Sequence, residues 1–114
     1  MEERGGTGEN QEDTEPMKVV IKDPGEPPYD AEIPNTLRAL QSIVCGYIET
    51  VTVSTDLCII CNEEGRIREL AQNCNICGID FVGTIVFTGV DGDEFADCPM
   101  TADKVYRLFI GART

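Results

Sequence analysis

Two CxxC pairs are the residues whose types and spacing most directly suggest chemistry. Cys58 and Cys61 form the first pair, and Cys74 and Cys77 form the second, with twelve residues between the pairs. Four thiolates at this spacing fit the tetrahedral coordination of one zinc ion. A zinc-stabilised interaction module is therefore one function that the rest of the sequence has to support or oppose.

The local sequence opposes a single ion that collects all four thiols. Residues 57–61 predict a β-strand, in which successive side chains alternate between two faces. Cys58 and Cys61 are three positions apart, so we expect them on opposite sides of the sheet. Cys74 to Cys77, followed by Gly78, is more typical of a metal knuckle. Neither pair precedes a helical pattern, which argues against a thioredoxin-like redox motif. We favour no metal and no cofactor, with zinc as the alternative.

The sequence contains no arrangement typical of an enzyme. Histidine is absent, which excludes Ser-His and Cys-His pairs and leaves no general base naturally poised near neutral pH. Ser42 and Ser54 lie in no nucleophile motif. Asp91, Asp93 and Glu94 resemble the start of a calcium loop, but the glycine and bidentate glutamate of that loop are missing. We predict a protein without catalytic activity.

The net charge of −12 indicates which partners the chain suits. Phosphate backbones and anionic membranes both need a basic footprint, so we expect binding to neither. A basic protein surface suits an acidic chain. The candidate contacts are the acids of predicted exposed turns: Glu63, Glu64, Asp91, Asp93, Glu94 and Asp97. No window approaches the about 18 apolar residues of a membrane helix, and the N-terminus has no apolar export signal. We expect a cytoplasmic protein.

Composition divides the chain at Met17. Residues 1–16 contain six acids, one base and no apolar residue after Met1, so burial cannot offset the entropy lost on ordering them. We predict a disordered acidic tail over 1–16 and a single domain over 17–114.

Hydrophobic periodicity and turn residues predict an α+β domain with a mainly antiparallel sheet, one helix after the first hairpin and a short C-terminal helix. Residues 66–80 read as irregular, and Gly65 stands at a turn position suited to positive φ. The expected elements are strands over 17–22, 29–33, 47–54, 57–61 and 81–90, a helix capped by Asn35 or Thr36 and ended by Gly46, and a final helix from Thr101 that buries Ala102, Val105, Leu108 and Phe109.

Four strings of residues resemble a family of small uncharacterised proteins, a domain of unknown function carried by phages and by mobile elements of gut Firmicutes. The strings are Met17–Lys22, Asn35–Glu49, Ile60–Gly65 and Val82–Phe87, and the resemblance covers about Met17 to Cys98. In that family, Cys45 is commonly glycine and Cys58 a plain aliphatic residue. This difference weakens the zinc hypothesis further.

The resemblance implies an accessory gene of a mobile element, and some similar proteins have been proposed as anti-CRISPR inhibitors of nucleases. The resulting hypothesis is a non-enzymatic anti-defence protein that binds the basic surface of a nucleic-acid-binding defence enzyme. Two alternatives stay open. One is a protein that sequesters a nucleotide signal in a pocket near Gly83 and Gly89, and the other is the zinc module.

Overall fold

The computed structural model describes residues 16–111. Every strand in it pairs with its neighbours in antiparallel orientation, in one main sheet and one separate two-stranded hairpin. The α+β class is confirmed. The elements, in chain order, are β1 (Pro16–Lys22), β2 (Tyr29–Pro34), α1 (Leu37–Val44), β3 (Ile48–Ser54), β4 (Leu57–Asn62), β5 (Gln72–Ile76), β6 (Ile79–Val82), β7 (Ile85–Asp91), β8 (Glu94–Ala96), α2 (Ala102–Val105) and the π-helical turn η1 (Tyr106–Ile110).

The main sheet has the order β2-β1-β7-β4-β3, and β8 also pairs with β7. β7 is the central strand, because Phe87 faces Val20 of β1 on one side and Ile59 of β4 on the other. Every residue of β4 is buried, as expected for a strand covered on both faces. The continuous apolar runs of these two strands therefore reflect their interior position.

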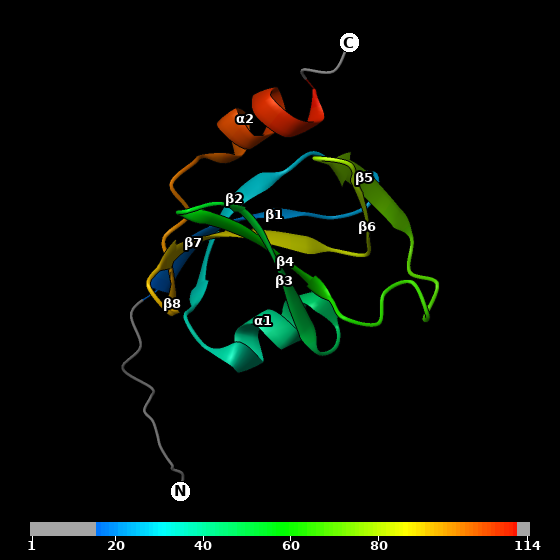
Figure 1. The fold of residues 1–114 in the computed structure, drawn as a ribbon, viewed down its shortest axis with the longest axis horizontal. Helices are drawn as coiled ribbons and strands as arrows, with labels where there is room; N and C mark the ends of the chain where they lie inside the picture. The colour runs from blue at the N-terminus through cyan, green and yellow to red at the C-terminus, as the bar shows by residue number, and fades with distance from the viewer. Residues whose placement is uncertain (1–15, 112–114) are drawn as a thin grey trace, which may run out of the picture.

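Two layers cover the opposite faces of the sheet (Figure 1). Helix α1 covers one face, where Leu40 and Val44 pack with Ile60. The β5–β6 hairpin and the C-terminal helix cover the other face, where Phe81 and Val105 pack with the rest of the second core. The alternation of side chains along β4 is what divides one strand between two cores.

Helix α1 begins at the predicted cap but ends one residue earlier than predicted. The Thr36 hydroxyl accepts a hydrogen bond from the Ala39 amide at 3.1 Å. Cys45, not Gly46, adopts the left-handed conformation that ends the helix, with φ of 65°. Gly46 instead provides space for Asn62, whose amide lies 2.7 Å from where a Cβ would be. Asn62 uses that space to donate hydrogen bonds to the last carbonyls of the helix.

The region between β4 and β7 differs most from the prediction. Residues 66–80 were expected to be irregular, but they contain β5 and the start of β6. Gly83, with φ of 73°, separates β6 from β7 and so divides the single strand predicted over 81–90. Gly65 does not have a positive φ, and its role is to let Val82 pack closely against the turn. The local pattern did not reveal these tertiary contacts.

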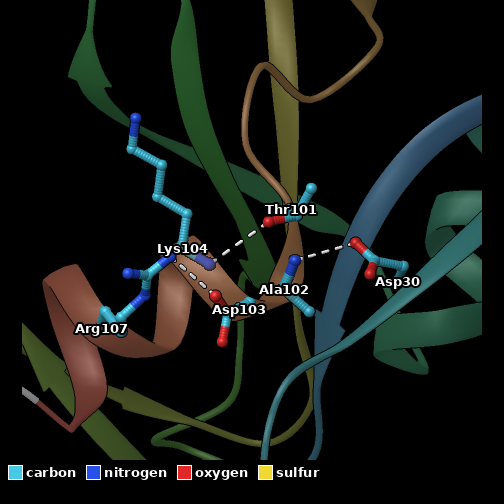
Figure 2. Close-up of polar contacts among 6 residues, drawn as sticks. All are labelled: Asp30, Thr101, Ala102, Asp103, Lys104 and Arg107. Carbon is cyan, nitrogen blue, oxygen red and sulfur yellow. Dashed lines mark hydrogen bonds and ion pairs between the residues drawn. The ribbon is translucent and has the colours of Figure 1, made fainter.

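The final helix begins at Thr101, as predicted, and is tied to the sheet at that point. The Thr101 hydroxyl accepts a hydrogen bond from the Lys104 amide at 3.3 Å. The carboxylate of Asp30 in β2 accepts one from the Ala102 amide at 2.8 Å (Figure 2). An ion pair of 2.7 Å between Asp103 and Arg107 lies on the exposed side of the same helix.

The predicted burial of Leu108 is wrong, since 52% of this residue is exposed. The helix widens into η1, where the Gly111 amide donates to the Tyr106 carbonyl five residues earlier. A wider turn changes which residues face the sheet. Phe109 and Ile110 pack against the core in place of Leu108.

Strand β1 begins at Pro16, which pairs with Pro34 in the first hairpin. The rest of the predicted tail, residues 1–15, lies outside the described residues, as do residues 112–114. No helix within residues 16–111 has the length and apolar character needed to cross a membrane.

Candidate functional site

Cys58 and Cys61 lie on opposite faces of β4, which confirms the expectation from strand alternation. Cys58 belongs to the core beneath α1, where its sulfur lies 3.1 Å from the Thr88 hydroxyl. Cys61 belongs to the core beneath the β5–β6 hairpin. One ion cannot contact both sulfurs through an intervening sheet.

The second CxxC pair is part of a β-hairpin and not a metal knuckle. Cys74 is half-buried on β5, and Cys77 is exposed at the hairpin tip. Cys77 and Gly78 both have positive φ, the signature of a tight two-residue hairpin turn. Within the part of the chain that the structure describes, no three Cys, Asp or Glu side chains are grouped so that they could hold a metal ion. The four thiols therefore do not form one site.

The buried thiol of Cys61 is expected to make the free energy of unfolding depend on pH. Burial raises the pKa of this thiol from 9.0 to about 11, with Glu49 adding to the rise and Arg66 opposing it. A raised pKa in the folded state means that the unfolded chain loses its proton first as the pH rises. The protonated Cys61 thiol therefore makes its full contribution to the free energy of unfolding below about pH 9. This contribution, on the order of 2 kcal/mol, is lost as the pH approaches 11.

Urea unfolding at several pH values between about 7.5 and 10.5 measures this loss. We expect the Cys61→Ala variant to lose less stability over this range than the wild type. Cys77→Ala, at the exposed hairpin tip, is the control and should keep the wild-type dependence. Equal slopes for Cys61→Ala and the wild type would contradict the assignment to Cys61.

The six predicted contact acids divide between the two ends of the sheet. Ile60 pairs with Val86, which places the turn after β4 beside the start of β7. The β7–β8 turn lies at the other end of the same strand. A strand of this length separates the two groups by on the order of 20 Å. The structure therefore brings together one pair, Glu63 and Glu64, and one larger group, Asp91, Asp93, Glu94 and Asp97.

The turn after β4 has mixed charge. The Asn62 side chain accepts a hydrogen bond from the Glu64 amide at 2.7 Å, which shapes the turn. Two arginines follow in the same turn, and the guanidinium of Arg68 donates to the Cys45 carbonyl at 2.9 Å. Glu63 and Glu64 are exposed but stand beside positive charge, so this end presents no uniform potential.

The β7–β8 turn is uniformly acidic. Asp91 pairs with Glu94, and Gly92, with φ of 66°, and Asp93 form the two-residue turn between them. All three acids of the turn are exposed. Asp97 is the next acid after Glu94 in the sequence. One of its carboxylate oxygens accepts a hydrogen bond from the Lys18 amide at 2.8 Å. The sequence has no lysine or arginine from 69 to 103.

The comparison with protein families identifies the domain. A family model described as "Domain of unknown function (DUF3846)" matches residues 17–110. The chain belongs to this family. No curated protein and no solved structure matches it. The match spans nearly every element of the fold, including the turn after β4, the β7–β8 turn and all six cysteines.

Gly83 and Gly89 of the DUF3846 domain have packing roles. A Cβ on Gly83 would lie 2.8 Å from the Leu70 side chain, and one on Gly89 would meet the backbone of Asp97. Two cavities of about 320 and 610 Å³ have linings that include neither glycine, and Val82, beside Gly83, is the residue that comes nearest to them in the chain. The glycine positions therefore give no support to the nucleotide-pocket alternative.

The smaller cavity of the DUF3846 domain escaped the sequence-based reasoning. It is lined by β3, β4, β6 and the turn after β4, including Ile67 and Ile79. The only local signal was an isoleucine inside a strongly charged turn, and 83% of Ile67 is exposed. The cavity arises because the hairpin folds over the sheet, and that placement is tertiary.

Proposed function

We propose that this DUF3846 protein is a non-enzymatic, cytoplasmic binding protein whose β7–β8 turn contacts a basic protein surface. In its finer form, the proposal is an anti-defence protein of a phage or mobile element. It would occupy the basic channel that a defence enzyme such as a CRISPR nuclease uses for nucleic acid. Direct binding to nucleic acid or membrane is not part of the proposal, because the charge has the wrong sign.

The observation that carries the proposal is the β7–β8 turn itself. Asp91, Asp93 and Glu94 are exposed at the two-residue turn that joins β7 to β8 at one end of the sheet. Figure 1 shows β8 at the left of the view. A short, closed turn loses little conformational freedom on binding, which favours affinity. Three carboxylates gathered at one turn can substitute for the phosphates of a nucleic acid strand.

Three hydrogen bonds hold the base of this turn against the rest of the domain. Asp97 accepts one from the Lys18 amide in β1 at 2.8 Å. The Asn35 side chain, just before α1, donates another to the Phe95 carbonyl at 3.0 Å. The Cys98 amide also donates to the Lys18 carbonyl at 2.8 Å. The acidic turn is thus attached to β1 and to the start of α1, as a rigid contact surface requires.

The test neutralises the turn without changing its shape. We expect the Asp91→Asn, Asp93→Asn, Glu94→Gln triple variant to bind a purified CRISPR nuclease about tenfold more weakly at low salt, or weaker still. The wild type should inhibit target-DNA cleavage by that nuclease, and inhibition should fall as salt rises. Cleavage assays and biolayer interferometry measure the two effects.

A triple variant with the same change in charge provides the control. Glu26→Gln, Glu32→Gln, Glu69→Gln alters three exposed acids outside the β7–β8 turn. Equal losses in both triple variants would show that net charge, and not the turn, is responsible. Failure to inhibit any nuclease in a panel from different CRISPR types would reject the finer form. Binding of other basic proteins through the turn would still be open to measurement by the same pair of variants.

A further inference from the structure

β3 is an edge strand with an unprotected edge. Among residues 16–111 it pairs only with β4. The Glu63 amide donates to the Tyr47 carbonyl at 2.8 Å, so the hydrogen-bonded pairs of this ladder fall at alternate positions from 47. The backbone groups of Ile48, Thr50 and Thr52 consequently point away from β4. They are available to a further strand.

The two edges of the sheet differ in how they are protected. β2, at the opposite edge, contains Asp30, Glu32 and Pro34, and charged residues and proline are the usual means of blocking an edge. β3 has neither proline nor lysine, its one charged residue is Glu49, and its register irregularity lies at its C-terminal end, between Thr52 and Ser54. Five of its seven residues are β-branched threonine, valine or isoleucine. Such residues favour strand pairing. β3 is therefore the edge suited to accept another strand.

The groove beside β3 is the cavity of about 320 Å³. Val51 of β3 and Phe81 and Val82 of β6 contribute apolar lining. Two exposed isoleucines extend this apolar surface, Ile67 with 83% and Ile79 with 38% of its area accessible. Exposed isoleucines beside a groove are typical of a surface that binds a partner.

The charges around the groove select its occupant. Glu49, Glu63 and Asp80 line it against one base, Arg66, whose guanidinium donates to the Asp80 carbonyl at 2.7 Å. The excess of acids favours a cationic partner. A second copy would place Glu49 beside like charges of an equally acidic chain, which is unfavourable. Charge complementarity therefore indicates a different, basic protein.

We propose that β3 and this groove bind an extended basic segment of a partner protein as an added antiparallel or parallel strand. The added strand takes its affinity from the backbone groups of β3 and its specificity from alternate side chains. Glu49 and Val51 face the groove two residues apart. The preferred segment accordingly carries a lysine or arginine two residues from an aliphatic side chain. This surface is separate from the β7–β8 turn, so the inference goes beyond the proposed function and does not depend on it.

A fluorescein-labelled nonapeptide, Thr-Lys-Thr-Val-Thr-Lys-Thr-Val-Thr, tests the proposal by fluorescence anisotropy with the full chain. We expect saturable binding that weakens about tenfold or more in Thr50→Pro and in Glu49→Lys. Proline at an outward-facing edge position leaves the β4 ladder intact, and Glu49 is exposed, so both variants should keep the fold. Glu26→Lys, in the distant β1–β2 turn, makes the same charge change and should bind as the wild type does.

Hydrogen exchange provides a second readout that a loss of folding would not imitate. In the wild type, the amides of Thr50 and Thr52 should gain protection when the peptide binds, and a peptide with glutamate in place of lysine should give none. Absence of saturable binding up to about 1 mM, or binding unaffected by Thr50→Pro, would overturn the proposal. A dimer of the free protein that Thr50→Pro dissociates would assign the edge to a second copy and would also overturn it.

Discussion

Replacing Phe87 with alanine is expected to lower the free energy of unfolding by about 3–5 kcal/mol. Phe87 is fully buried in the central strand, between Val20 of β1 and Ile59 of β4. Its ring also stacks on Phe109, with ring centroids 6.3 Å apart. Domains of this size are stable by only about 5–15 kcal/mol, so this loss is between about a fifth and all of the total. Urea denaturation measures the change.

Phe109→Ala is the matched comparison, since this ring is only half-buried. Its cost should be well below that of Phe87→Ala. The double variant should reveal a coupling of about 0.5–1.5 kcal/mol between the two rings. A loss of less than about 1 kcal/mol for Phe87→Ala would contradict the central position assigned to β7.

The second large effect is expected from Gly89→Ala. A Cβ at this position would clash with the backbone carbonyl oxygen of Asp97, and backbone cannot move aside as cheaply as a side chain can. The segment after β8 would have to shift, which breaks the hydrogen bonds that Asp97 and Cys98 make with Lys18. We expect a loss of about 3 kcal/mol, measured by thermal and urea unfolding.

Gly92→Asn controls for the loss of a glycine in the same hairpin. Gly92 has positive φ but open space around its Cα, and asparagine tolerates this conformation better than most residues. Its stability should change by less than about 1 kcal/mol. A Gly89→Ala variant as stable as Gly92→Asn would show that the segment around Asp97 is not packed against β7.

The local elements of the fold were predictable because their signals are short-range. The first hairpin, α1 with its Thr36 cap, and β3 and β4 occur close to the predicted positions. The placement of Cys58 and Cys61 on opposite faces followed from the two-residue period of a strand alone. That one geometric rule was sufficient to oppose a four-cysteine metal site.

The candidate sites were less predictable, because they depend on register and on layer packing. The six acids share a residue type and turn positions, but strand register separates Glu63 and Glu64 from the β7–β8 turn. The hairpin at 72–82 was missed because its pairing is weakly patterned and contains a register irregularity. Without that hairpin there is no groove beside β3 to predict.

By itself, the sequence determined the class of the fold, the positions of most elements, the acidic charge and the division of β4 between two faces. These properties follow from backbone periodicity, turn chemistry and composition, which act over a few residues. Only the tertiary structure decided which strand lies at the centre, which edge is unprotected, and which acids share a surface. Those properties arise from contacts between residues far apart in the chain, such as Asp97 with Lys18, and no local pattern encodes them.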